Sequence, residues 1–220
     1  MKYLFPCLIV IAFSSCSSFK KLPDSGLSPG YYQSKEIHSE YTKVYLDVKE
    51  DSLIIIPIDK TGNSLSPVKQ TNGMIFLQRS FDIDVLTVPF KFRPSSYNFP
   101  RQLTTDFNGN VYFGYRLDRY KSIIAQTPAG TLKKIQHLAL TLGGFGGLGT
   151  TFIGPSTTNY RTTDEYNALI LTRGVSLMAG VNNLTVGLGV GWDYIRDRDK
   201  GIWIYQNKPW FGLAISLNIN

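Results

Sequence analysis

The clearest pattern along the chain is a strict alternation of large apolar residues with small or polar ones. From Leu184 to Tyr194 every second residue is large and apolar, and the residues between them are Thr, Gly or Asp. The segment 211–219 repeats this pattern against Gly, Ala, Ser and Asn. A period of two is typical of a β-strand and not of a helix. Both segments therefore predict strands, each about long enough to cross a bilayer at a tilt.

Further segments show the same alternation. It occurs at residues 138–143 and 111–118, where Leu, Val, Phe and Tyr alternate with small or polar residues. Residues 81–92 alternate as well, but the phase changes between Val85 and Leu86, which predicts a β-bulge at that point. Together these segments predict about six long strands in the latter part of the chain.

The N-terminal part predicts shorter elements. The apolar runs 44–48 and 53–58 are separated by the polar residues 49–52, a pattern typical of a hairpin. Met74–Leu77 is a further short run. Counted with the long strands, the hairpin brings the expected total to about eight, the number that closes a small barrel.

The domain organisation follows from these patterns. Residues 1–15 have an early Lys, an apolar run and small residues at the end, as a signal peptide does. Residues 16–40 are polar and aperiodic, which predicts a tether. Residues 41–220 are expected to form one β-barrel domain, with the N-terminal hairpin and short strand in 41–80 and the long strands in 81–220.

The end of the signal segment carries a further motif. Phe13-Ser14-Ser15-Cys16 resembles the lipobox of bacterial lipoproteins, in which the cysteine receives lipid and becomes the new N-terminus. The resemblance implies lipidation of Cys16. Cys7 lies in the part removed, so the mature chain has no second cysteine for an intramolecular disulfide.

Composition narrows the class of partner. Tyr and Phe number 13 each, and only 18% of the residues are charged, fewer than the quarter or so usual for a soluble surface. The formal net charge of +7 suits an anionic membrane surface, but the basic residues are not clustered as a nucleic-acid footprint would be. With 2 His and no metal-ligand spacing, we expect no metal and no cofactor.

The alternating faces indicate a membrane barrel. A soluble barrel needs a hydrated exterior, yet the residues that alternate with the large apolar ones are mostly Gly, Ala, Ser, Thr and Asn, which suit a narrow lumen. The large residues would then meet lipid in a closed, antiparallel up-and-down barrel of about eight strands. The charged residues on the lumen face are expected to form a polar network there: Asp82, Asp84, Arg116, Asp118 and Asp193.

Connection lengths predict the two rims of the barrel. Asn182-Asn183 reads as a tight turn, whereas 154–164 and 196–208 read as long loops at the opposite end. The strand ends beside those loops carry aromatic residues, which predict an interfacial girdle. Its expected members are Phe152, Tyr166, Trp192, Tyr194 and Trp210.

One glycine-rich segment has the spacing of a nucleotide-binding motif. Residues 144–149 match the spacing GxGxxG of dinucleotide sites, but residues 150–155, TTFIGP, are not expected to open the helix that such a site requires. The segment is therefore interpreted as a glycine-lined strand.

Taken as a whole, the chain resembles the small outer-membrane barrels and surface lipoproteins of the Bacteroidota. The segments that carry the resemblance are FDIDVLTVPFKFRPSS from Phe81, GNVYFGYRLDRY from Gly109 and IWIYQNKPWFGLAISLN from Ile202. It implies a lipid-anchored location in the cell outer membrane, with outer-membrane lipid as a partner, and it implies no particular activity.

We therefore expect an outer-membrane lipoprotein with a structural or binding role in the envelope, and not an enzyme. One alternative is a barrel enzyme acting on lipid or peptide, with His137 and Ser176 or Asp193 as catalytic groups. The other is a soluble periplasmic lipoprotein with a ligand-binding β-barrel. In that case Leu188 and Trp192 would be buried.

Overall fold

The computed structural model consists of antiparallel β-strands with two short 3₁₀ helices, which confirms the predicted all-β class. It describes residues 27–35, 41–49, 52–96, 99–128, 130–181 and 184–217. Within these residues ten strands form a single sheet. The elements are β1 (Gly30–Lys35), β2 (Thr42–Lys49), β3 (Ser52–Pro57), β4 (Ile75–Arg93), β5 (Gln102–Thr104), β6 (Asn108–Thr127), β7 (Gly130–Ile153), η1 (Ser156–Thr158), β8 (Tyr166–Val181), β9 (Leu184–Ile195), η2 (Arg198–Gly201) and β10 (Pro209–Leu217).

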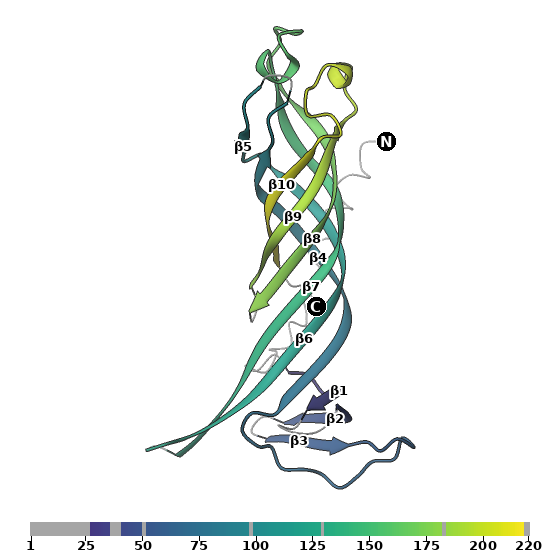
Figure 1. Ribbon diagram of the computed structural model, residues 1–220, viewed down its shortest axis with the longest axis vertical. Coiled ribbons are helices and arrows are strands. Elements are labelled where there is room, and N and C mark those ends of the chain that lie inside the picture. Colours follow the sequence, from purple (N-terminus) through teal and green to yellow (C-terminus); the bar gives the residue numbers. More distant parts are fainter. Residues whose placement is uncertain are drawn as a thin grey trace, which may run out of the picture.

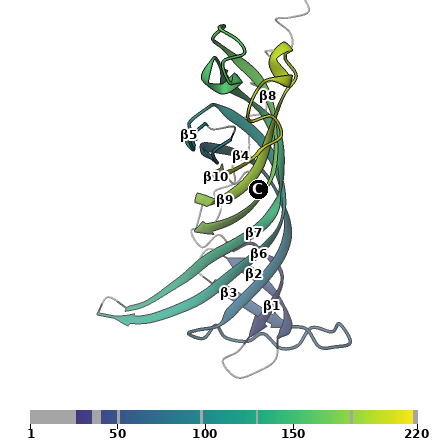
Figure 2. The same ribbon diagram turned by 45° about the horizontal axis from the view of Figure 1, so that its top comes forward.

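Six of the strands form a partial ring. Strands β4, β6, β7, β8, β9 and β10 are neighbours in that order, and β10 pairs in turn with β4. The pairing of β10 with β4 covers residues 85–92 of β4, and β8 pairs with β7 only from Ala139 onwards. Below these levels β4, β6 and β7 continue as an open sheet (Figure 1, Figure 2).

The ring holds fewer strands than the expected number of about eight. The run Met74–Leu77 and the segment from Phe81 belong largely to one strand, β4. The predicted hairpin is confirmed, since β2 pairs with β3, but it lies outside the ring. Strands β1, β2 and β3 extend the sheet from residues 75–77 of β4 and lie together at the lower end in Figure 1.

The prediction of a tether over residues 16–40 is wrong for its later part, because β1 lies there. Tyr32 of β1 is buried against Leu46 and Phe76, which fixes the strand on the sheet. The alternation in β1 escapes a hydropathy pattern because its inward residues are one tyrosine and one serine. The signal segment 1–15 and Cys16 lie outside the described residues.

The predicted bulge between Val85 and Leu86 is also wrong. Leu86 and Val88 are both fully buried and lie on the same face as Asp84. The alternation is hard to follow in the sequence because apolar residues occupy both faces of β4 here. In fact Leu86 and Val88 pack inside the ring while Val85 is 52% exposed.

The phase of β4 changes after Val88 instead. The next buried residue is Lys91, so one extra residue is inserted between the two alternating segments. The pairing with β10 shifts its register at the same level, between Leu213 and Ile215. Pro89 explains this position, because proline has no N–H to donate to a ladder and is found at bulges or edges.

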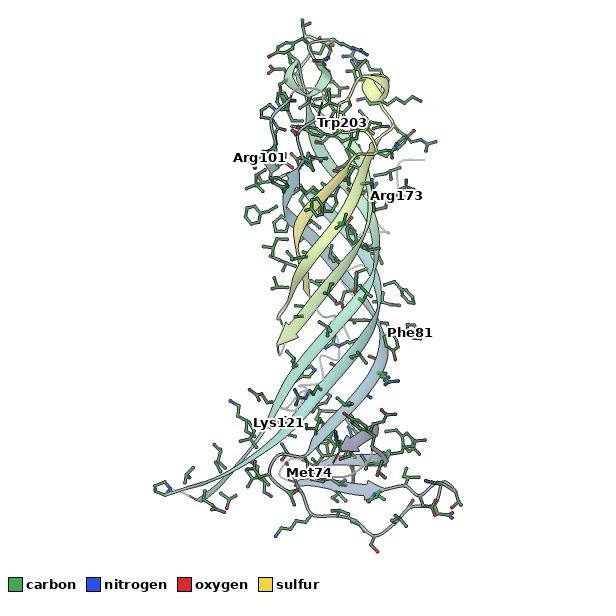
Figure 3. All side chains as sticks on the ribbon, viewed as in Figure 1. Met74, Phe81, Arg101, Lys121, Arg173 and Trp203 are labelled. Atoms are coloured by element: carbon green, nitrogen blue, oxygen red, sulfur yellow. The ribbon has the colours of Figure 1, made fainter. Side chains whose placement is uncertain are left out.

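Around the ring the large apolar side chains point outward, as the alternation predicts. Phe81 is 68% exposed, Leu142 is 63% exposed and Leu188 is 72% exposed, while charged residues on the opposite face of the ring, such as Asp82 and Asp193, are buried. Figure 3 shows Phe81 on the outer flank of the ring. Others with this orientation are Ile83, Val111, Phe113, Leu117, Leu140, Leu169, Val175, Leu177 and Phe211.

Side chains fill the interior in layers. A lower apolar cluster joins β1–β3 to the ring and contains Leu27, Tyr32, Val44, Leu46, Ile55, Met74, Phe76 and Tyr120. A middle apolar layer contains Leu86, Val88, Tyr112, Phe145, Met178, Trp210 and Ala214. An upper apolar layer contains Ile153, Ala168, Ile170, Ile195, Trp203, Ile204 and Tyr205. Buried polar residues lie between these layers along β4, β6, β7, β8, β9 and β10.

The long loops at the upper end cover the ring. Residues 154–165 and 196–208 lie at the same end, as predicted, and the backbone N–H of Ile204 donates to Thr157 O at 3.0 Å. Trp203 and Tyr205 of the second loop are buried in the upper apolar layer. Figure 3 shows Trp203 near the upper end of the molecule. The upper opening is therefore filled by the chain itself.

Candidate functional site

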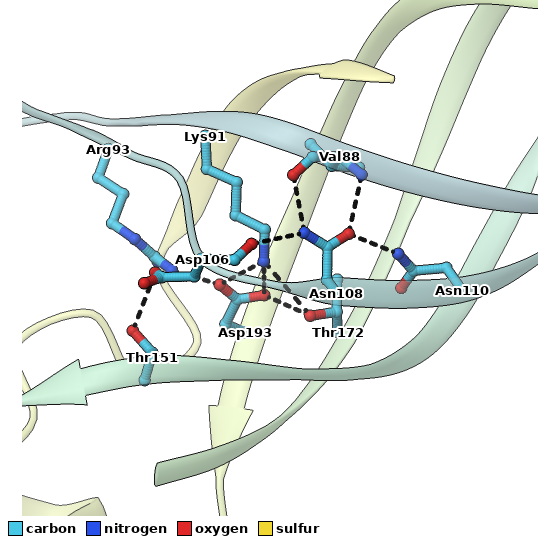
Figure 4. A network of polar contacts seen from close by, with 9 residues as sticks. All are labelled: Val88, Lys91, Arg93, Asp106, Asn108, Asn110, Thr151, Thr172 and Asp193. Carbon is cyan, nitrogen blue, oxygen red and sulfur yellow. Dashed lines mark hydrogen bonds and ion pairs between the residues drawn. The ribbon is translucent and has the colours of Figure 1, made fainter. Parts of the chain in front are cut away.

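The upper polar cluster is a group of buried charges around Asp193, which β9 directs into the ring. Lys91 Nζ lies 3.2 Å from Asp193 Oδ2, and Arg93 Nη2 lies 2.5 Å from the same oxygen. Thr172 Oγ1 of β8 donates to Asp193 Oδ1 at 2.8 Å. All these side chains are almost fully buried (Figure 4). A single carboxylate therefore joins β4, β8 and β9 from the inside.

Aromatic rings from the upper loop and β10 support the cations of this cluster. Lys91 Nζ lies 4.8 Å from the centre of the Trp210 ring. The Arg93 guanidinium lies 5.5 Å from the Trp203 ring and 5.0 Å from the Tyr205 ring. The negative face of an aromatic ring attracts a cation, and the attraction increases where water is excluded. These contacts offset part of the excess positive charge around Asp193.

The lower polar cluster is built on Asp118, between the middle and lower apolar groups. Arg116 Nε donates to Asp118 Oδ1 at 3.0 Å, and Arg116 Nη1 lies 3.4 Å from Asp82 Oδ2. His137 Nε2 lies 2.6 Å from Asp118 Oδ1. The His137 ring is stacked on Tyr120 with the ring centres 4.4 Å apart. The cluster thus connects β4, β6 and β7.

Asp84 has a partner on another strand. Ser216 Oγ of β10 donates to Asp84 Oδ2 at 2.8 Å, and both residues are buried. This bond lies where β10 and β4 pair, so it reinforces the contact that closes the ring.

The five residues predicted for a lumen network are all buried, but they form separate clusters. Asp82, Arg116 and Asp118 belong to the lower cluster, whereas Asp193 belongs to the upper one. Between them lies the middle apolar layer, in which Tyr112 and Trp210 are fully buried. In the described residues, side chains thus interrupt the polar path along the axis.

The candidate catalytic residues His137, Ser176 and Asp193 are not brought together. Ser176 pairs with Gly143 of β7. Gly143 is six residues beyond His137, and six residues span about 20 Å along a strand. Asp193 lies in the upper cluster, and the acid that His137 reaches is Asp118. The geometry gives a histidine–carboxylate pair that is also held by Arg116 and stacked on Tyr120, an arrangement that braces strands.

The aromatic residues predicted for a girdle differ in their placement. Phe152 is 42% exposed on the outer face, and Trp192 and Tyr194 are half-buried. Tyr166 is half-buried at the rim, where its hydroxyl donates to Asp199 Oδ2 at 2.8 Å. Trp210 does not belong to the girdle, because it is fully buried inside the ring and packs against Phe145. Its place follows from alternation in β10, where it lies on the face of Gly212 and opposite to Phe211.

Lys91 and Arg93 are the buried charges that the sequence analysis missed. A signal for them was present, since both alternate with the outward residues Phe90 and Phe92. Their cluster with Asp193 depends on the bulge in β4 and on the pairing of distant strands.

No helix in the described part of the chain is long and apolar enough to cross a membrane. The described residues contain no group of three or more His, Cys, Asp and Glu side chains placed to hold a metal ion. Comparison with known protein families, curated proteins and solved structures finds no match to this chain.

Proposed function

We propose that this protein is an integral β-barrel lipoprotein of the bacterial outer membrane, with a structural or binding role in the envelope. The observation that carries the proposal is the sidedness of the ring: apolar side chains such as Leu142 and Leu188 point outward, and charged ones such as Asp193 and Arg116 are buried inside. In water this orientation would expose a continuous apolar surface, which soluble monomers avoid. In a bilayer the same surface faces acyl chains.

Backbone hydrogen bonding gives independent support. A strand that crosses a membrane must satisfy its peptide groups within the protein, because hydrocarbon offers no partners. The pairing of β10 with β4 supplies these partners around the ring. We assign the membrane level to this part of the molecule. On this proposal the loops with η1 and η2 project from one side of the membrane and β1–β3 lie at the other.

The filled interior favours a structural or binding role over a pore. Tyr112, Phe145 and Trp210 occupy the middle of the ring, and Trp203 with Tyr205 fills its upper end. A ligand or partner would therefore meet the loops, the outer face or the N-terminal strands, with Cys16 anchoring the chain by its lipid.

The two alternatives have less support. A soluble periplasmic lipoprotein would bury Leu188, which is 72% exposed. A barrel enzyme would need a nucleophile beside His137, and Ser176 lies elsewhere on the sheet. The pair of His137 and Asp118 alone offers proton exchange at most.

Membrane fractionation of the full chain tests the proposal. Wild type and Cys16→Ala should both stay in the membrane pellet after an alkaline carbonate wash, because the ring itself is integral. Release of Cys16→Ala into the soluble fraction would favour a tethered soluble protein and contradict the proposal.

A charge on the outer face supplies a second test. Leu188→Lys should cost about 2–4 kcal/mol near the middle of the bilayer and reduce the integrated fraction. Leu65→Lys is the matched control, because Leu65 is 51% exposed in the loop between β3 and β4. Equal integration of the two variants would argue against a lipid-facing surface at Leu188.

A further inference from the structure

The outer face of the ring carries a groove of about 860 Å³ beside Arg173. It lies over β6, β7, β8 and β9 and is mainly apolar, with one cationic side chain. Its lining includes Val111, Phe113, Gly144, Gly146, Arg173 and Trp192.

The groove exists because β7 presents glycine where other outward positions carry large side chains. A Cβ on Gly144 would come no closer than 3.6 Å to Gly174 O, and one on Gly146 no closer than 3.7 Å to Thr172 O. These are ordinary contact distances, and neither glycine has a positive φ. Packing does not require glycine at either position, so the space above them is open to a ligand.

Arg173 is unusual for its position. It points outward from β8 and pairs across the sheet with Trp192 and Gly146. Among the outward residues described on β8, β9 and β10 it is the only charged one. In the described part of the chain no acidic side chain forms an ion pair with it. Figure 3 shows Arg173 in the upper half of the ring, on its outer flank.

These features together define the ligand chemistry. A guanidinium on a membrane-facing surface is costly unless an anion neutralises it. Its planar fork matches the oxygens of a phosphate group. The neighbouring Trp192 is of the residue type that concentrates at the headgroup level. The apolar walls favour an anion that also carries an acyl chain.

We propose that this groove binds an anionic phospholipid, with its phosphate at Arg173 and an acyl chain over Gly144 and Gly146. The proposal rests on the proposed function, because the groove faces lipid only if the ring spans a membrane. The apolar lining makes a lipid headgroup, and not free phosphate, the expected source of the anion.

Tryptophan quenching can test this binding in the full-length protein. Trp203 and Trp210 are 3% and 0% exposed, so Trp192 is the tryptophan nearest to lipid. The protein is reconstituted in phosphatidylcholine vesicles that contain a small fraction of either brominated phosphatidylglycerol or brominated phosphatidylcholine. Trp192→Phe supplies the background signal. We expect brominated phosphatidylglycerol to quench Trp192 at about fivefold lower mole fraction than brominated phosphatidylcholine, as one charge-assisted contact predicts.

Matched variants distinguish a specific contact of the lipid with Arg173 from a general attraction of anionic lipid to basic residues. Arg173→Gln should abolish the preference for phosphatidylglycerol, whereas Arg119→Gln, an exposed outward arginine of β6, should retain it. Gly144→Leu should fill the groove and reduce quenching by both brominated lipids. The proposal is overturned if Arg173→Gln keeps the wild-type preference, or if Arg119→Gln loses it equally.

Two further outcomes distinguish the proposals from each other. If inorganic phosphate removes the preference at constant ionic strength, the site takes a free anion, and the lipid proposal is overturned. If the protein floats with carbonate-washed vesicles but shows no preference, this inference alone fails. If the protein does not float with the vesicles, the proposed function fails as well.

Discussion

The side chain of Asn108 replaces the ladder hydrogen bonds of Val88, the residue at which β4 changes phase. Asn108 Oδ1 accepts from Val88 N at 2.8 Å, and Asn108 Nδ2 donates to Val88 O at 2.7 Å (Figure 4). Both residues are buried. The amide therefore satisfies the two peptide groups that the bulge removes from the sheet.

Asn108→Ala should lower the free energy of unfolding by about 2–4 kcal/mol, because each buried backbone group left unpaired costs about 1–3 kcal/mol. The measurement is urea unfolding of the full chain in detergent, followed by tryptophan fluorescence. Thr87→Val is the control: it removes one bond from Thr87 Oγ1 to Asn108 O and leaves the Val88 contacts. Equal losses in the two variants would show that the bulge does not depend on the Asn108 amide.

The buried carboxylate of Asp193 leads to a second prediction. Asp193→Asn should destabilise the protein by about 3–5 kcal/mol, since it removes the carboxylate that forms the ion pairs with the buried Lys91 and Arg93. Adding Lys91→Met should recover part of this loss by removing one of the unpaired charges. Unfolding of the single and double variants in urea measures both effects. If the double variant is no more stable than Asp193→Asn, the unpaired charge of Lys91 does not contribute to the loss of stability.

These clusters illustrate what the sequence could predict. A period of two leaves only two faces, so alternation alone placed Arg116, Asp118 and Asp193 inside. It could not predict which charges meet, because Lys91 and Asp193 are 102 residues apart in the chain and come together through strand pairing. The phase of β4 was misplaced because Leu86 and Val88 are apolar yet belong to the interior.

We predict that the stability of the protein falls at alkaline pH because of Tyr205 in the upper loop. Burial raises the pKa of Tyr205, and the nearby Arg93 opposes this shift more weakly. A raised pKa in the folded state means that the stabilisation is complete below the unfolded tyrosine pKa of about 10 and is lost as the pH rises above it. Tyr205→Phe should therefore lose less stability than wild type in this alkaline range.

Trp203 makes the effect measurable, because its ring centre lies 6.1 Å from that of Tyr205. Urea unfolding is followed through tryptophan fluorescence at a series of pH values from neutral to alkaline. The hydroxyl of Tyr205 also donates to Gln102 Oε1, so Tyr205→Phe should be slightly less stable at neutral pH. Parallel pH curves for the two proteins would rule out Tyr205 as the titrating group.

Gly114 and Tyr112 provide a test of packing in the middle layer. A Cβ on Gly114 would collide with the Tyr112 ring, and all the nearest atoms belong to that one side chain. Gly114→Ala should cost about 1–3 kcal/mol by overpacking. In the presence of Tyr112→Leu the same substitution should cost much less, so the double-mutant cycle should show coupling. Gly146→Ala, with no atom closer than 3.7 Å, is the control and should be nearly neutral. Additive effects of Gly114→Ala and Tyr112→Leu would mean that the glycine is not there to admit the tyrosine ring.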